Sequence, residues 1–167
     1  GNYKLDVHSS VIRAINKNKD LLKDVPKARI GREVAKMMQV ERPHDAMEFM
    51  AEHGLLAAID PAMAKMVGYK QNTPHHKWDL WKHTMTSLKK AESEDMVLNL
   101  AILFHDIGKP DASDEEQGTF HGHEKHGAEH VAQVLEKIEL PTAIVKRVEN
   151  LVAMHMRLLT IPETATV

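Results

Sequence analysis

The chain has no cysteine, few aromatic residues and no long apolar run. The lack of cysteine excludes thiolate metal ligands, cysteine nucleophiles and a disulfide framework. No apolar stretch approaches the ~18 residues that a membrane-spanning helix needs, and no segment resembles a signal peptide. These absences favour a cytoplasmic protein that does not enter a membrane.

Histidine and methionine are abundant instead. The 167 residues include 12 histidines and 10 methionines, whereas Phe, Trp and Tyr together make up 4%. Flexible methionine side chains suit the irregular contacts between packed helices. An excess of histidine without cysteine indicates that any bound metal ion has imidazole and carboxylate ligands.

Charge is distributed unevenly along the chain. Residues 1–40 carry nine Lys and Arg against four acidic residues, a net charge of +5. Because the whole chain has a net charge of −2, the remainder carries −7. The basic segment either contacts a phosphate backbone or forms an ordinary solvated helical surface, and both interpretations stay open at this point.

Apolar periodicity and helix-boundary residues predict an all-α fold of about eight helices, with no sheet. The length suits one domain with a small appended piece, and the charge changes sign near residues 40–43. Pro110 is expected to end the sixth helix, and residues 111–118 are expected to form the longest loop. The predicted helices cover residues 9–24, 26–38, 43–53, 61–67, 76–90, 95–106, 123–138 and 141 to beyond 155.

His105 and Asp106 are the strongest candidates for chemistry. They follow an apolar run at the end of a predicted helix, where burying a carboxylate is costly unless it is paired or bound to a metal ion. A hard divalent cation prefers imidazole nitrogen and carboxylate oxygen that converge from rigid elements. Lys109 lies three residues after Asp106, one helical turn away on the same face.

Histidines on other predicted helices would complete a metal site inside the helical bundle. His83, His123 and His155 each come from a different helix. Taken singly, His83 or His155 is more often a packed or solvated histidine than a ligand. His121, His126 and His130 lie in a polar, Glu-rich stretch. They are therefore expected to be surface residues or to hydrogen-bond to the metal ligands.

The run His-Asp-Ile-Gly-Lys at residues 105–109 resembles the signature of the HD phosphohydrolase superfamily. The flanking residues are similar to one branch, the HD domain of bacterial CCA-adding enzymes and related poly(A) polymerases. They are Gln71, His75, His76, Asp79, Trp81 and His83 before the run, and Phe120 to Glu124, Gly127, Ala128, Leu151, Val152 and His155 after it.

The N-terminal part resembles a second piece of the same enzymes. Residues 25–38, with Ala28, Arg29, Ile30 and Glu33, are similar to the small RNA-binding helical segment that joins the nucleotidyltransferase head to the HD domain. The resemblance therefore covers roughly residues 5–158. It predicts a helical RNA-binding segment at residues 1–42 and an HD domain at residues 43–167, with the metal site in the interior of the bundle.

The resemblance implies metal-dependent hydrolysis of phosphoesters on nucleotides or RNA ends. Phosphatase and 2′,3′-cyclic phosphodiesterase activity belong to this family, and tRNA is a candidate partner. One or two divalent ions are expected, with nickel, manganese or magnesium favoured and zinc or iron as alternatives. The ligands implied are His83, His105 and Asp106 at the core, with His123 and His155 in addition.

Several further residues receive roles by their position. Asp106 and Lys109 are the expected catalytic residues, with the Lys109 ammonium offering charge to the phosphoryl group. Arg157 is a second candidate for contact with a substrate phosphate. Asp79 lies four residues before His83 and is expected to orient its imidazole, and His76 lies on the same helical face.

Two departures from the family pattern keep other functions open. The chain has no Gly-Gly-x-x-Arg-Asp run of a nucleotidyltransferase head, so it is not expected to add nucleotides by itself. It also has no aspartate after Asp114, although many HD enzymes take a last ligand from there. The alternatives are an RNA- or tRNA-binding module with a vestigial or structural HD site, and an HD-type di-iron oxygenase.

Overall fold

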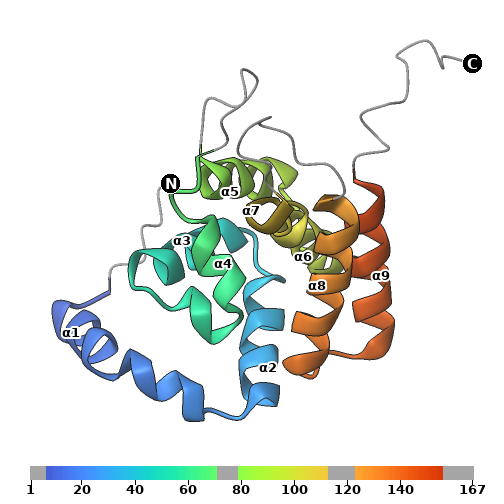
Figure 1. Ribbon diagram of the computed structural model, residues 1–167. Helices are drawn as coiled ribbons and strands as arrows, with labels where there is room; N and C mark the ends of the chain where they lie inside the picture. Colours follow the sequence, from blue (N-terminus) through green and yellow to red (C-terminus); the bar gives the residue numbers. More distant parts are fainter. Residues whose placement is uncertain (1–6, 71–78, 113–122, 156–167) are drawn as a thin grey trace, which may run out of the picture.

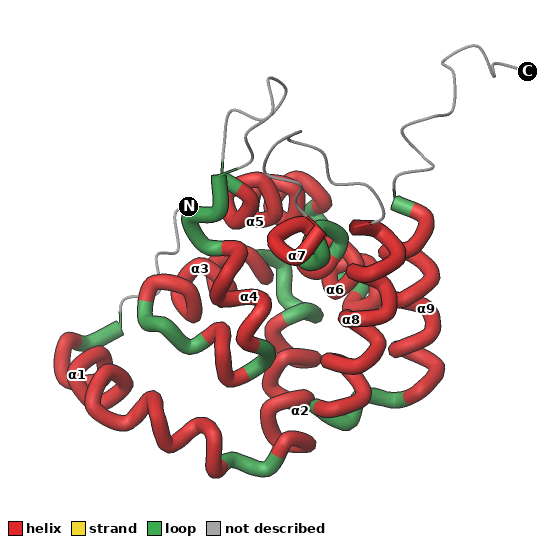
Figure 2. The backbone as a smooth tube through the Cα atoms, viewed as in Figure 1, coloured by secondary structure: helices red, strands yellow, loops and turns green. Residues whose placement is uncertain are grey.

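The computed structural model describes the backbone of residues 7–70, 79–112 and 123–155, with all of their side chains except those of residues 111, 112 and 123–125 (Figure 1). These three ranges contain α-helices and short 3₁₀ helices (η) and no strand, which confirms the all-α prediction (Figure 2). The elements are α1 (Ser9–Asn18), η1 (Lys19–Asp24), α2 (Lys27–Met37), α3 (Pro43–Glu52), η2 (Leu56–Ala58), α4 (Pro61–Met66), α5 (Leu80–Ala91), α6 (Met96–Phe104), α7 (Lys109–Ala112), α8 (His123–Lys137) and α9 (Thr142–Met154).

Local sequence explains where α3, α4, α5 and α6 begin. Pro43 and Pro61 are the first residues of α3 and α4, where a helix needs no backbone N–H donor. Three starts, that of α4 among them, are capped by an aspartate whose carboxylate accepts a hydrogen bond from a backbone N–H of the first turn. These caps are Asp60 for α4, Asp79 for α5 and Asp95 for α6.

Two predicted boundaries are wrong. The fifth helix begins at Leu80 rather than at residue 76, because Asp79 has an extended backbone and its carboxylate accepts from the Lys82 N–H at 2.8 Å. Residues 111–112 are helical rather than loop, since α7 begins at Lys109 and holds Pro110 in its first turn, where proline is tolerated. The first predicted helix also changes to 3₁₀ geometry from Lys19 onward.

The buried apolar side chains form one cluster that extends from α2 to α9. Within it α5 packs on α6, α6 on α9 and α9 on α8, while α3 also packs on α5 and α7 packs against α8. In Figure 1 the start of α8 and the end of α9 lie at the same end of the molecule, near α7. The packing therefore brings the start of α8, at His123, and the end of α9, at His155, to the same end of the bundle. No helix of the described ranges has the length and apolar character needed to cross a membrane.

The N-terminal helices differ in how they join this core. α1 buries none of its residues, whereas α2 contributes Val34, and Met38 follows it into the core. Gly31 of α2 lies so close to the end of α8 that a Cβ on it would be 1.9 Å from the Ile138 carbonyl oxygen. The absent side chain thus permits the contact between α2 and α8. The division of the chain between residues 42 and 43 stays a prediction.

We expect Gly31→Ala to destabilise the protein by about 1–3 kcal/mol, because the added methyl group overlaps backbone atoms that cannot move independently. The matched control is Gly127→Ala in α8, where a Cβ would have its nearest neighbour at 3.5 Å, an ordinary contact. That substitution should be neutral or stabilise by about 0.5–1 kcal/mol through helix propensity. Urea unfolding of both variants measures the difference, and equal stabilities would contradict the packing argument.

Candidate metal centre

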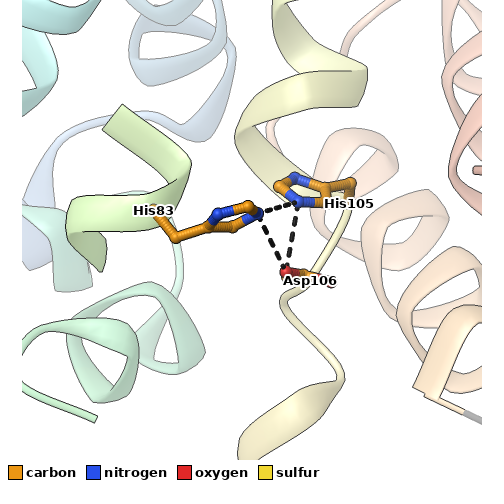
Figure 3. Close-up of side chains that lie close together, drawn as sticks. All are labelled: His83, His105 and Asp106. Atoms are coloured by element: carbon orange, nitrogen blue, oxygen red, sulfur yellow. Dashed lines mark hydrogen bonds and ion pairs between the residues drawn. The ribbon is translucent and has the colours of Figure 1, made fainter. Parts of the chain in front are cut away.

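His83, His105 and Asp106 bring their polar atoms together in the interior of the bundle (Figure 3). The Nε2 atoms of the two histidines are 3.2 Å apart. Asp106 Oδ2 lies 3.1 Å from His105 Nε2 and 3.7 Å from His83 Nε2. The three side chains that were predicted as the core of a metal site therefore converge.

The packing of α5 on α6 produces this convergence. His83 lies in the first turn of α5, four residues after the Asp79 cap, and its backbone N–H donates to the Asp79 carbonyl. His105 is the C-cap of α6, and Asp106 opens the turn that leads to α7. Asp106 is only 2% exposed, so its charge needs partners inside the protein.

Carbonyls in the last turns of α6 and α9 fix the orientation of two histidine rings. His105 Nδ1 lies 2.7 Å from the Ile102 carbonyl oxygen, and His155 Nδ1 lies 2.6 Å from the Val152 carbonyl oxygen. A carbonyl only accepts hydrogen bonds, so Nδ1 must carry the proton in each ring. In the neutral imidazole the lone pair is then on Nε2, the atom that faces Asp106.

His155 and Lys109 surround the same carboxylate from two other elements. His155, the C-cap of α9, places Nε2 3.6 Å from Asp106 Oδ1. Lys109, the first residue of α7, places Nζ 2.7 Å from Asp106 Oδ2 and is 6% exposed. The buried carboxylate thus has imidazole nitrogens on both oxygens and an ammonium on one of them.

The environment of His155 favours its protonated form when no metal ion is bound. Burial acts to lower the pKa of His155, but hydrogen bonds to Asp106 and to the Val152 carbonyl, with the negative charge of Asp106, raise it above its ordinary value. The opposing charge of Lys109 reduces this rise. An ion and a proton would compete for Nε2 of His155.

The donor set fits a divalent transition-metal or magnesium ion. Ligand atoms bound at about 2.1 Å in tetrahedral or octahedral geometry lie roughly 3.0–3.4 Å from their neighbours. The observed separations of 3.1, 3.2 and 3.7 Å among His83, His105 and Asp106 are close to this spacing. In addition, two imidazole lone pairs and a carboxylate that face one another repel unless a cation or a proton lies between them. The part of the chain that the structure describes therefore contains a candidate site for a divalent ion.

Some predicted residues lie outside what the structure describes. His123 is the first residue of α8, but its side chain is not described. His76, His121 and Arg157 lie in ranges that the structure does not describe. Gly127, one turn after His123, packs against the turn that contains Ile107 and Gly108. The backbone at the start of α8 therefore lies near the turn that contains Asp106. The role of His123 as a metal ligand stays a prediction.

Two other residues make contacts that the sequence did not indicate. The Asp79 carboxylate caps α5 at the Lys82 N–H, so the contact it shows is with the backbone. His130 of α8 places Nε2 3.0 Å from Asp60 Oδ1, at the start of α4. The Ile102 and Val152 carbonyls were also missed. A histidine at the C-cap of a helix, three residues after a carbonyl of the last turn, is the signal that would have found them.

Comparisons with known proteins agree with this site. The sequence model of the family described as "HD domain" matches residues 73–165, and the model described as "Probable RNA and SrmB- binding site of polymerase A" matches residues 4–66. The chain belongs to the HD domain family. The resemblance found in the sequence, an HD domain that follows a segment of this second family, is confirmed.

Similar curated proteins include two tRNA nucleotidyltransferases and a protein named Multifunctional CCA protein. An A-adding tRNA nucleotidyltransferase of Deinococcus radiodurans is 38% identical over 111 residues, 62% of this chain and 25% of that protein. A CC-adding tRNA nucleotidyltransferase of Thermus thermophilus is 32% identical over 136 residues, 77% of this chain and 31% of that protein. A Multifunctional CCA protein of Shewanella denitrificans is 29% identical over 116 residues, 68% and 28% respectively. The chain spans about a quarter to a third of the length of these relatives.

We expect Asp106→Asn and His105→Ala to lower the affinity for Mn²⁺ by at least about a hundredfold. Loss of a residue that only hydrogen-bonds to a metal ligand already lowers metal affinity by about 10–100-fold, and these two residues are proposed ligands themselves. Isothermal titration of the metal-stripped protein measures the affinity. The matched control is Asp95→Asn, since asparagine caps a helix as well as aspartate does and Asp95 begins the same α6. Unchanged Mn²⁺ binding in either site variant would show that the ion binds elsewhere.

Proposed function

We propose that the protein is a metal-dependent phosphohydrolase that acts on nucleotides or RNA-end phosphates, with 2′,3′-cyclic phosphodiester hydrolysis as the first activity to test. The observation that carries this proposal is the convergence of His83 and His105 on the buried Asp106 carboxylate. Membership of the HD domain family supports it. Similarity to enzymes named for work on tRNA supports RNA ends as the source of the phosphate.

His83, His105 and Asp106 would hold the ion, with His123 and His155 as further ligands. A bound divalent ion would lower the pKa of a coordinated water molecule and neutralise phosphoryl oxygens. Nickel, manganese and magnesium are the first candidates, and zinc or iron are alternatives. The Ile102 and Val152 carbonyls would keep the His105 and His155 rings in orientation while substrate binds.

The exposure of the ligands indicates where substrate would approach. The side chain of His83 is 34% exposed, whereas those of His105 and Asp106 are 17% and 3% exposed. A phosphate group would therefore reach the centre from the side of α5. The Lys109 ammonium, held on Asp106, would add positive potential where charge develops on the phosphoryl oxygens. Arg157 remains a candidate for contact with the substrate phosphate.

We expect the protein with added Mn²⁺, Ni²⁺ or Mg²⁺ to hydrolyse 2′,3′-cyclic AMP, with loss of activity in Asp106→Asn and His105→Ala and normal activity in Asp95→Asn. Release of the 2′- or 3′-monophosphate, measured by chromatography, checks this. Full activity in the two site variants would refute the assignment. Oxygen consumption by the iron-loaded protein, without hydrolysis, would favour the di-iron oxygenase alternative.

A second candidate function, RNA binding, rests on the charge of the N-terminal helices. Basic residues of α1, η1 and α2 are exposed, and this part matches a family that is described as an RNA-binding site. Phosphate contacts by such residues would release counterions and make binding depend on salt. The exposed basic residues are Arg13, Lys17, Lys19, Lys23, Arg29, Arg32 and Lys36.

We expect replacement of Lys17, Lys23 and Arg32 by alanine to weaken tRNA binding and to reduce the log–log salt slope by roughly two to three. The control replaces three exposed lysines of the other helices, Lys89, Lys90 and Lys146, by alanine. Fluorescence anisotropy with labelled tRNA at several salt concentrations measures both slopes. Tight, salt-dependent binding without any hydrolysis would favour an RNA-binding module over an enzyme, and equal slopes in the two triple variants would exclude the basic segment as the contact.

A further inference from the structure

A carboxylate from another helix holds the imidazole of His130 on α8. Nε2 of His130 lies 3.0 Å from Asp60 Oδ1, and the same oxygen accepts a hydrogen bond from the Ala62 N–H at 2.8 Å. Asp60 is the N-cap of α4 and is only 8% exposed, so the fold fixes where its carboxylate lies. The pair contains none of the residues that converge in the metal centre.

The hydrogen bond to Asp60 determines which nitrogen of His130 can bind an ion. A carboxylate only accepts hydrogen bonds, so Nε2 of His130 carries the proton. The lone pair of the neutral ring is then on Nδ1, and the His130 side chain is 35% exposed. Histidines that bind metal ions usually donate their other ring N–H to a carboxylate or a carbonyl. Asp60 thus orients His130 as a ligand that solvent can reach.

His126 brings a second imidazole to the same side of α8. It is exposed and lies four residues before His130, so the two side chains are neighbours on one face of the helix. Two histidines at this spacing on a helix are the chelating pair of a well-known type of zinc site. Gly127 and Ala128 between them are buried, so the helix that carries the pair is anchored in the core.

We propose that His126 and His130 form a second metal site, for ions that prefer imidazole ligands such as Ni²⁺, Cu²⁺ and Zn²⁺. Water molecules would fill the other coordination positions, because among the described residues a group of three potential ligands occurs at the metal centre alone. Asp60 is a positioning residue that acts through His130. The site would bind its ion whether or not the metal centre is catalytic.

Ion preference separates this site from the metal centre. Two imidazoles without a carboxylate ligand bind Ni²⁺ and Cu²⁺ far better than Mn²⁺ or Mg²⁺, which favour oxygen ligands. The metal centre offers the Asp106 carboxylate in addition to imidazoles. Mn²⁺ therefore reports on the centre, and Ni²⁺ reports on the α8 site once the centre has been disabled.

The experiment is an isothermal titration with Ni²⁺ of the full chain without an affinity tag, in a double variant that carries His105→Ala and Asp106→Asn. The double variant should still bind one Ni²⁺ on α8. Addition of His126→Ala or His130→Ala should lower this affinity by at least about tenfold, since each removes one of two ligands. Cu²⁺ bound to the double variant should show electron paramagnetic hyperfine coupling to two nitrogen ligands, and to one after His126→Ala.

Two further substitutions test the role of Asp60 and provide the matched control. Serine caps a helix as well as aspartate does but is too short to reach His130, so Asp60→Ser should lower the Ni²⁺ affinity by about tenfold. His53→Asn removes a histidine that has no other histidine within four residues, and it should leave the affinity unchanged. Equal affinity in Asp60→Ser would refute the positioning role.

Retained Ni²⁺ affinity in both His126→Ala and His130→Ala would overturn the second site, and so would a double variant that binds no Ni²⁺. Neither result affects the metal centre, which is tested by Mn²⁺ binding and by variants of its own ligands. Should the double variant fail to fold, the α8 substitutions are made in the wild type. There they should remove one Ni²⁺ and leave the Mn²⁺ affinity unchanged, and loss of Mn²⁺ binding instead would refute a separate site.

Discussion

The buried carboxylate of Asp106 is the group on which the arrangement of the helices around the site depends. A charge that is 2% exposed is tolerated only where other groups compensate for the lost water. Here the compensation comes from four side chains on four elements: His83 of α5, His105 at the end of α6, Lys109 of α7 and His155 at the end of α9. Because α5, α6 and α9 also bury apolar residues in one common core, the position of the carboxylate and the packing of the bundle constrain each other.

Helix ends supply the second part of this arrangement. Two of the histidines are C-caps, and each donates Nδ1–H to the carbonyl three residues earlier, in the last turn of its helix. One hydrogen bond thus satisfies a backbone group and fixes both the tautomer and the direction of the ring. Ligand orientation in this protein is a consequence of how α6 and α9 terminate.

The N-terminal helices are attached to the same framework through a contact that depends on the absence of a side chain. Gly31 lets α2 approach the last turn of α8, at the far end of the helix that begins with His123. In Figure 1 the basic helices α1 and η1 lie at the opposite end of the molecule from α5 and α7. Contact with RNA at the basic surface and chemistry at the metal centre would therefore use different parts of one packed unit, which is consistent with a match to two family models in succession.

The sequence by itself determined the helical class, most helix boundaries, the adjacency of His105 and Asp106, and the family. These follow from short-range physics, because apolar periodicity, proline and aspartate caps act within a few residues. Only the tertiary structure decided that His83 and His155 face Asp106, and that Lys109 lies buried on its carboxylate. It also decided that Asp79 lies just before α5, as its N-cap. These outcomes depend on how the helices pack, as in the close approach of Gly31 to Ile138, and spacing along one helix carries no information about the rotation of another.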